Sequence, residues 1–471
     1  MIFNSLTFVA FFIIVMVLHG LPFSWETKKR NLLIASYVFY AAWNPAFVLL
    51  LWLSTVVDWF VARALYRATT PSGRRAWLLV SVSTSLCILV AFKYYDFLVD
   101  TSAWLLTLAG VAYRPPHLDI VLPIGISFYT FATMSYTLDI YHRRSEPASR
   151  FLDYALFVTF FPHLVAGPIT RAPQLVPQFQ KEHRASGDAI AYGLALIVAG
   201  LFLKVVIADG FLAATVDTVY DHHAIPATLD AWVATLAFSG QIFCDFSGYS
   251  TAAIGAALCL GFTLPENFRR PYGAIGFSDF WRRWHITLST WLRDYLYIPL
   301  GGSRHGPWRT SGALLGTMLL GGLWHGANWT FVAWGALHGG YLVAERGLRR
   351  AFPSYRPGPV AMPVLAVGTF VLVSAAWAFF RATTMTRALA IVGAMGGVAN
   401  GTRRILDNYA LVTAVALVVV IVATHWAMRE RSVDSILVRT PAWLIGIAVA
   451  AMAFAIVTVQ DGGRSFLYFQ F

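Results

Sequence analysis

The sequence has little charge and few cysteines, and both shortages narrow the class of protein. Only 12% of the 471 residues are Asp, Glu, Lys or Arg, about half the share of about 25% in a soluble domain. Together with 58% hydrophobic residues and a mean hydropathy of +0.62, this indicates an integral membrane protein. Cys87, Cys244 and Cys259 lie in apolar runs with neither a disulfide framework nor a metal-ligand spacing. We therefore predict no metal site and expect the three cysteines in the core.

Other signals are absent as well. There is no Gly-x-x-x-x-Gly-Lys-Ser/Thr loop for a nucleotide and no convincing internal repeat of the kind found in many secondary transporters. The net charge of +12 would suggest nucleic acid in a soluble protein. Here, however, Lys and Arg collect in short loops at 63–75, 143–150, 346–356 and 429–439. That distribution is typical of cytosolic loops in a polytopic protein, so nucleic acid is not expected as a partner.

Long apolar runs account for most of the chain. The runs 2–21, 409–427 and 442–459 can each cross a hydrocarbon core about 30 Å thick. We predict an all-α polytopic protein, one membrane domain over residues 1–471, with roughly eleven transmembrane helices. Shorter apolar pieces at 104–111 and 391–399 are expected to be re-entrant or interfacial.

The first apolar run differs from a cleavable signal peptide. It begins at residue 2 without a preceding charge, and the basic cluster Lys28, Lys29 and Arg30 follows it. A signal peptide has the opposite arrangement, with a positive region first. We expect a retained anchor with its N-terminus outside and the following basic loop inside.

Polar residues divide the domain into three regions. Residues 1–115 are N-terminal helices separated by basic turns, with a break at Asn44–Pro45, and residues 346–471 are C-terminal helices. Residues 116–345 place His, Asp, Arg, Asn and Gln at membrane depth. Because polar groups within a bilayer are costly and mark functional sites by default, we expect the catalytic core in this middle region.

The run 312–344 contains 33 residues without Asp, Glu, Lys or Arg, about 50 Å if it formed one helix. That is too long for a single span, and the glycine-rich segment 321–329 is the expected break. His325 lies in this segment, about 20 Å along from the start of the run, where a neutral imidazole can act as a general base. Alternatively, it only hydrogen-bonds between helices. Neighbouring candidates for orienting or binding substrate are Trp324, Asn328 and Trp329, although tryptophan more often serves packing.

The second polar cluster runs from 278 to 295. On one helix, Asp279 would pair with Arg282 and Arg283, and His285 would share a face with Leu288, Ser289 and Leu292. In the functional interpretation, His285 faces a pocket and arginines, including Arg293, hold an anionic ligand. In the alternative, the segment is an interfacial helix with an aromatic belt.

The order of the motifs resembles a known enzyme family. Phe280-Trp281-Arg282-Arg283-Trp284-His285, followed 40 residues later (325 − 285) by Gly322-Leu323-Trp324-His325-Gly326, resembles the membrane-bound O-acyltransferase family. Within it, the chain looks most like the bacterial proteins of polysaccharide and alginate O-acetylation. Supporting motifs in chain order are 122–128, 161–169, 245–250, 264–268, 297–302 and 468–471.

The resemblance implies a function and roles for several residues. It implies a ring of helices around a membrane tunnel, with His325 at the near-invariant histidine and His285 at the second histidine or asparagine position. The reaction would move an acetyl group from cytosolic acetyl-CoA, a substrate and not a bound cofactor, across the bacterial inner membrane to hydroxyls of an exported polysaccharide such as alginate. Arg282, Arg283 and Arg293 would meet CoA phosphates, and the expected partner is an extracytoplasmic acetyltransferase with a serine nucleophile.

Two histidines and three other functions remain open. His163 occupies a place where many relatives have Gln, and a satisfied core histidine is the simpler interpretation. His338 also resembles a family feature, and we expect a structural or secondary role for it. The alternative functions are a D-alanyl transferase fed by a carrier protein, a lipid- or protein-directed acyltransferase of the same family, and a transporter.

Overall fold

The computed structural model describes residues 1–471 except 114, 115, 117, 119, 399, 400, 402, 403, 432, 460–465 and 468–471. The described residues form helices and connecting segments without a strand, which confirms the all-α fold. They divide into two compact units, residues 1–194 with 253–265, and residues 195–252 with 266–471. The single domain over 1–471 stays a prediction, and the terminal motif at 468–471 lies outside the described residues.

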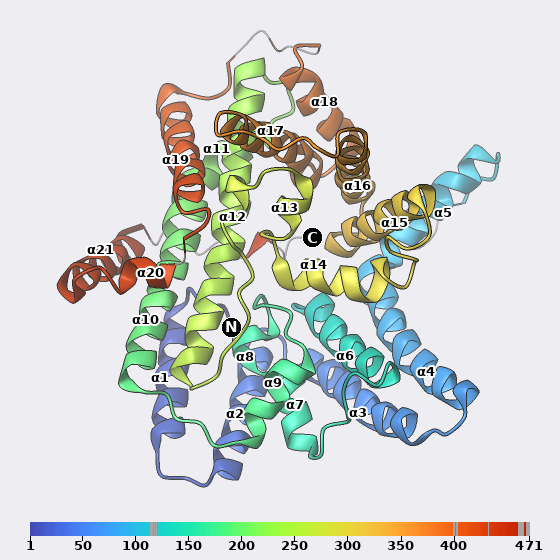
Figure 1. Cartoon of the computed structure of the whole chain (residues 1–471), viewed down its shortest axis with the longest axis vertical. Helices are drawn as coiled ribbons and strands as arrows, with labels where there is room; N and C mark the ends of the chain where they lie inside the picture. Colours follow the sequence, from blue (N-terminus) through green and yellow to red (C-terminus); the bar gives the residue numbers. More distant parts are fainter. Residues whose placement is uncertain are drawn as a thin grey trace. The chain divides into compact units, whose positions relative to one another are not determined.

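The first unit contains the N-terminal helices. The segment Asn44–Pro45 separates two of them, as predicted, because proline cannot continue the hydrogen-bond ladder of the preceding helix. Helices α3, α4 and α6 pack on one another, and α2 packs on α7 (Figure 1). Its helices are α1 Leu6–Gly20, α2 Trp25–Ala41, α3 Ala46–Arg67, α4 Pro71–Leu89, a π-helical segment Val90–Tyr94, α5 Tyr95–Leu108, α6 Ile126–Tyr141, α7 Phe151–Thr159, α8 Phe161–Leu164 and α9 Ala172–Gln180.

The second unit contains the polar segments singled out above. Two helices are shared with the first unit: α10, Gly187–Leu201, begins there, and α12, Thr228–Cys259, the longest helix of the chain's described part, ends there. Helix α10 leads into a π-helical segment Phe202–Leu212. The remaining elements are α11 Ala213–Tyr220, a 3₁₀ turn Pro271–Gly273, α13 Phe277–Trp281, α14 Ile286–Leu292, a π-helical segment Arg293–Tyr297, α15 Pro307–His325, α16 Trp329–Ala351, α17 Ala361–Arg381, α18 Met385–Met395, α19 Asn408–Ala427, α20 Val433–Leu437 and α21 Ala442–Val459.

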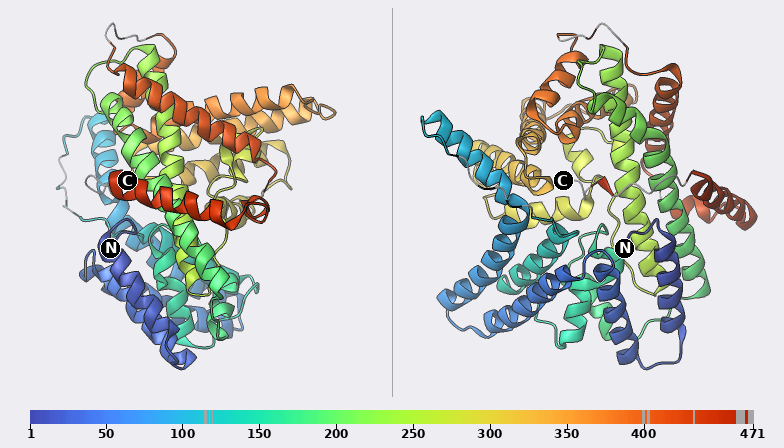
Figure 2. Two further views of the ribbon diagram at one scale, coloured as in Figure 1. Left: turned by 90° about the vertical axis from the view of Figure 1, so that its left-hand side faces the viewer. Right: turned by 180° about the vertical axis from the view of Figure 1, so that it is seen from behind.

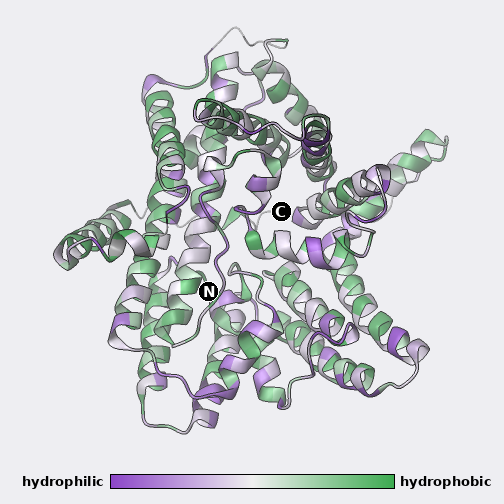
Figure 3. Ribbon diagram, viewed as in Figure 1, coloured by the Kyte–Doolittle hydropathy of each residue, from purple (hydrophilic) through white to green (hydrophobic). Residues whose placement is uncertain are grey.

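The helices have the length and composition of membrane spans. Among the described residues, 7 helical stretches are long and apolar enough to cross a membrane, and α1 and α18 are shorter apolar helices. Apolar residues run the length of α19 and α21 (Figure 3), and α21 buries none of its side chains within the protein. Exposed apolar helices of this length belong in lipid, so the chain is a multi-pass membrane protein.

Two local expectations in the first unit were wrong. Lys28 and Lys29 lie buried in the first turns of α2 and not in an open loop. The reason is a local ion-pair cluster: the Lys29 ammonium lies 2.5 Å from Asp153 Oδ1 and 3.4 Å from Glu26. Cys87 is exposed, whereas Cys244 and Cys259 are buried as expected. An exposed cysteine on a span needs no core position because lipid accepts its apolar side chain.

The break predicted at 321–329 is confirmed. Helix α15 ends at His325, and α16 begins at Trp329 with Asn328 as its N-cap. The two helices pack closely because glycines face each other: a Cβ on Gly322 would lie 2.3 Å from Phe331 O, and one on Gly335 would lie 2.3 Å from Met318 O. Figure 2 shows this hairpin from two further sides. Small residues that allow helix backbones to approach are a common basis of packing in membranes.

Candidate active site

His325 lies at the last position of α15, where the chain leaves the helix. Its side chain is 4% exposed and packs edge-on against Trp334 and Phe380, with ring centroids at 5.1 and 5.3 Å. Helix α16 supplies Trp334 and α17 supplies Phe380. An imidazole held by aromatic edges in this way has a fixed orientation, as a side chain that acts in catalysis needs, and little contact with water.

His285 lies at a break that the sequence did not predict. The single helix expected over 278–295 is wrong: α13 ends at Trp281, α14 begins at Ile286, and His285 between them has a left-handed backbone with φ 41°. Consequently His285 does not share a helix face with Leu288. Backbone bonds to a preceding segment outcompete the helix, since Arg269 N donates to Arg283 O and Ile286 N donates to Asn267 O, at 2.8 and 2.9 Å.

Asn267 determines which nitrogen of His285 carries the proton. Asn267 Oδ1 accepts the backbone N–H of Thr287 at 3.3 Å and lies 3.1 Å from His285 Nδ1. A backbone N–H can only donate, so the shared atom is an acceptor and His285 Nδ1 must be the donor. In the neutral ring, Nε2 therefore holds the lone pair. His285 is fully buried; its one N–H is committed to Asn267, and Nε2 can only accept a hydrogen bond or a proton.

Trp324 connects the two histidines. Its ring centroid lies 4.9 Å from that of His325 and 6.2 Å from that of His285. A wall of stacked rings continues from there, with Trp334 on Trp377 at 5.4 Å. The α15–α16 hairpin, α17 and the 267–285 segment therefore place both predicted histidines around one buried indole.

The predicted pair of Asp279 with Arg282 and Arg283 is confirmed. Asp279 Oδ1 lies 3.6 Å from Arg282 and 3.0 Å from Arg283 Nε, and Oδ2 lies 3.0 Å from Arg429. Burial by itself raises the pKa of the Asp279 carboxyl, but the Ile275 amide and the guanidinium groups of Arg429 and Arg283 hold that pKa below its usual range. Arg283 is thereby buried in a structural network, whereas Arg282 keeps most of its side chain exposed.

A basic cavity of about 910 Å³ lies against α13, α14, α15 and α16. Thr317 and Met318 of α15 form part of its wall, and Met318 lies seven residues before His325, about 10 Å along the helix. The cavity also contacts Trp281 and Ser289. Six arginines line it: Arg269, Arg282, Arg293, Arg346, Arg349 and Arg350.

Four of these arginines were missed by the sequence interpretation. Arg346, Arg349 and Arg350 looked like an ordinary cytosolic loop, yet they form the last turns of α16. Arg269 directly follows the motif 264–268, which was noted only as a family resemblance. The signal that could have found the first three is helical periodicity, because positions 346, 349 and 350 share one face at i, i+3 and i+4.

The remaining site candidates have varied environments. Asn328 caps α16 by accepting Thr330 N–H at 3.0 Å, and its Nδ2 donates to Thr383 O at 3.0 Å, so both ends of its amide serve the fold. Trp329 is half exposed. Ser289 lines the basic cavity, and its hydroxyl donates to Trp284 O at 3.1 Å. Substrate binding by these residues stays a prediction.

The two histidines left open have buried positions. In the first unit, His163 Nε2 bonds to Phe157 O at 3.0 Å, which supports the satisfied core histidine. In the second unit, His338 is fully buried and packs against Trp281 and Trp334, at 5.2 and 4.8 Å. His338 thus belongs to the aromatic wall beside His325, one turn of α16 after Trp334.

A buried ion cluster holds the described end of the chain. The Lys204 ammonium pairs with Asp245 and lies 3.0 Å from Asp209 Oδ1. Asp245 Oδ2 accepts the backbone N–H of Leu467 at 3.1 Å. Phe466 packs on Phe246 at 5.5 Å, and Phe246 meets His285 edge-on at 4.6 Å. The motif at 245–250 therefore supports His285 from a third side.

The chain is similar in sequence to several known proteins. The family model described as MBOAT, membrane-bound O-acyltransferase family, matches residues 143–375, which include both histidines. A probable alginate O-acetylase of Azotobacter vinelandii is 43% identical over 91% of this chain and 85% of its own. One of Pseudomonas aeruginosa is 44% identical over 84% of this chain and 75% of its own. A peptidoglycan O-acetyltransferase of Helicobacter pylori is 38% identical over 79% of this chain and 74% of its own.

Proposed function

Because this chain belongs to the membrane-bound O-acyltransferase family, we propose that it moves an acetyl group from cytosolic acetyl-CoA across the bacterial inner membrane for O-acetylation of an exported polysaccharide. The chain is an O-acyltransferase with a multi-pass membrane fold. Alginate is the acceptor favoured by the similarity to the probable alginate O-acetylases.

The observation that carries the choice of donor is the basic cavity. Six arginines line a space of about 910 Å³, large enough for a cofactor-sized molecule, since ligand pockets measure about 300–1,000 Å³. Guanidinium groups bind phosphate oxygens in bidentate fashion, and CoA carries several phosphates. Arg282 and Arg293 are the predicted donor contacts that line it, whereas Arg283 acts at a distance by holding α13 in place.

His325 is the proposed general base. As the acceptor oxygen attacks the thioester carbonyl, His325 takes the hydroxyl proton. The C–S bond then breaks, and the departing thiolate takes up that proton to leave as CoA thiol. The neutral ring of His285 can only accept through Nε2, which favours orientation of the donor through one of its amide N–H groups over stabilisation of an oxyanion, since an oxyanion needs a donor.

The acceptor side requires a second protein in this proposal. The acceptor oxygen that attacks the thioester is the serine hydroxyl of an extracytoplasmic acetyltransferase, which leaves as an acetyl ester and passes the acetyl group on to sugar hydroxyls, regenerating the free serine. The competing donor is a carrier-bound D-alanyl thioester. The arginine-lined cavity favours CoA, because its nucleotide phosphates would occupy the cavity itself, whereas a carrier protein would leave most of that volume unused.

The double variant Arg346→Gln, Arg350→Gln tests the donor site. Loss of two phosphate contacts should raise KM for acetyl-CoA roughly hundredfold or more, with kcat little changed, because charge-assisted hydrogen bonds contribute about 1.5–3 kcal/mol each. Initial rates are measured in proteoliposomes supplied with acetyl-CoA. Arg304→Gln, an exposed arginine outside the cavity, is the matched control. An unchanged KM, or activity only with a carrier-bound D-alanyl thioester, would contradict the assignment.

A further inference from the structure

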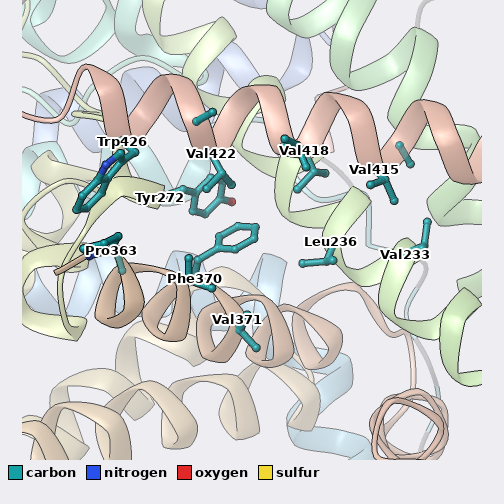
Figure 4. Close-up of a pocket in the computed structure, with 15 residues that line it drawn as sticks. Val233, Leu236, Tyr272, Pro363, Phe370, Val371, Val415, Val418, Val422 and Trp426 are labelled. Atoms are coloured by element: carbon teal, nitrogen blue, oxygen red, sulfur yellow. The ribbon is translucent and has the colours of Figure 1, made fainter. Parts of the chain in front are cut away.

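Besides the basic cavity, the second unit has an apolar groove between α12, α17 and α19. It measures about 460 Å³, and valine, alanine, leucine, proline and aromatic side chains form its walls. The labelled residues Val418 and Val422 of α19 face Phe370 of α17 across it (Figure 4). The Tyr272 hydroxyl, a polar group of this wall, donates to Ser239 O at 2.5 Å. The groove therefore offers its occupant apolar contact and no hydrogen bond from Tyr272.

We propose that this groove binds one acyl chain of an anionic phospholipid from the cytosolic leaflet. The size of the groove selects the kind of occupant. A transmembrane helix about 10 Å wide and about 30 Å long fills roughly 2,400 Å³, several times the 460 Å³ available. A partner helix or a second copy of the chain could cover the groove but could not enter it, whereas a flexible hydrocarbon chain can.

The length of the groove matches half a bilayer. Along α19 the lining residues run from Ala414 to Trp426, and along α17 from Pro363 to Val371. At 1.5 Å per residue these stretches are about 18 and 12 Å long. One leaflet contributes about 15 Å of a hydrocarbon core about 30 Å thick. An acyl chain lying along the groove would reach from the membrane surface to the bilayer centre.

Basic residues beside one end of the groove indicate in which leaflet the lipid lies and which headgroup it carries. The groove end marked by Pro363 and Trp426 lies near the start of α17 and the end of α19 (Figure 4). Exposed Arg356 precedes α17, and exposed Arg431 follows α19. Basic flanks of this kind are typical of the cytosolic side and attract anionic lipids. A tryptophan at the same end is where the interfacial aromatic belt of a membrane protein is expected.

The groove shares a wall with the site segment. Tyr272 packs on Phe370 at 5.0 Å and on Trp284 at 6.1 Å, and Trp284 directly precedes His285. A bound chain would therefore stabilise the segment that carries His285, and binding to the folded state alone raises thermal stability.

Two neighbouring valines on α19 provide a matched test. Val419 lines the groove and Val420 does not, yet their side chains are 59% and 60% exposed, so tryptophan at either position leaves the core intact. In Val419→Trp the indole occupies groove volume. Val367→Trp on α17, which lines the groove at 55% exposure, is an independent second variant.

The measurements are native mass spectrometry of the full-length purified protein and its unfolding midpoint with added phosphatidylglycerol or phosphatidylcholine. The wild type and Val420→Trp should retain a phospholipid, and phosphatidylglycerol should raise their midpoint more than phosphatidylcholine does. Val419→Trp and Val367→Trp should need roughly tenfold more lipid for the same rise, since displacing about two methylenes costs that factor. Arg431→Gln should reduce the preference for the anionic lipid.

Three outcomes would overturn the proposal. Equal behaviour of Val419→Trp and Val420→Trp would mean that only unspecific surrounding lipid binds. An equal rise of the unfolding midpoint with both lipids would show that the groove does not select an anionic headgroup. A bound polypeptide in place of lipid would identify a different occupant.

Discussion

At the residue scale, the side chains in direct contact with each histidine decide what it can do. Asn267 fixes the tautomer of His285 through a carbonyl oxygen that Thr287 N–H also uses. His325 instead is held by aromatic edges from Trp334 and Phe380. Both histidines are buried beside Trp324, but their environments differ. His285 has a polar neighbour at Nδ1, whereas His325 lies among aromatic rings.

His325→Ala should reduce acetyl transfer by roughly 10²–10⁴-fold, the usual contribution of a general base, while the protein still folds and inserts. The measurement is the O-acetyl content of the exported polymer at matched protein level. His223→Ala, an exposed histidine of the same unit, serves as the control. Normal acetylation by His325→Ala would show that His325 is not the general base.

Asn267→Ala should weaken activity by roughly 10–100-fold, because His285 loses the acceptor that orients it. Leaving a buried donor without a hydrogen bond costs about 1–3 kcal/mol of free energy. Asn267→Asp keeps an acceptor oxygen and should retain more activity than Asn267→Ala. Thr287→Val removes one hydroxyl contact to Asn267 but leaves the bond to His285, and should stay close to wild type. Equal loss in all three variants, tracking their unfolding midpoints, would indicate a role in folding alone.

At the element scale, one of the two breaks around the site was predictable from local sequence. A 33-residue uncharged run exceeds one span, and Gly326 and Asn328 supply an interruption and a cap, so the end of α15 followed from length and composition. The break at His285 did not, because Asp279 and Arg283 form the ion pair that a continuous helix would also give. The bonds that stop the helix come from residues 267 and 269, a distance along the chain that periodicity does not report.

The arginines of the basic cavity likewise come from parts of the chain that are far apart in sequence, so local sequence patterns do not bring them together. Arg282 and Arg293 were predicted to bind phosphate because they lie close to His285 in sequence. Arg346 and Arg350 come from the far end of α16 and reach the cavity only because the α15–α16 hairpin returns the chain. A basic helix end at a membrane surface has an ordinary explanation in topology, so the sequence offered no reason to prefer a ligand.

The α15–α16 hairpin depends on glycine at its contact points. Gly335→Ala should destabilise the protein by roughly 1–3 kcal/mol, as overpacking does, because its Cβ would lie 2.3 Å from Met318 O. Gly340→Ala on the same helix meets nothing within 4 Å and should be neutral or gain up to about 1 kcal/mol from helix propensity. The two variants are compared by their unfolding midpoints in detergent. An unchanged midpoint for Gly335→Ala would show that the two helices can move apart without a loss of stability.

At the scale of the whole molecule, a membrane domain that holds both its histidines in an aromatic wall is suited to a small acyl group. The described helices supply seven apolar stretches long enough to span, and a polar site is assembled within the second unit alone. Recognition of a long hydrated polymer usually needs an extended groove of aromatic and polar groups exposed to water. The division of labour proposed above follows: this chain carries the acetyl group past a hydrocarbon barrier about 30 Å thick, and a partner delivers it.

Purified protein in proteoliposomes, with acetyl-CoA on one side and polysaccharide on the other, should therefore acetylate the polymer slowly or not at all until the serine acetyltransferase partner is added. The physical reason is access, since the acceptor must reach a buried indole and two buried histidines, which a small nucleophile can do and a polymer chain cannot. Acetyl release to a small acceptor should already occur without the partner and should disappear in His325→Ala, which separates a missing partner from an inactive preparation. Efficient polymer acetylation by this chain alone would show that the polymer enters the site directly, and the two-protein relay would then be wrong.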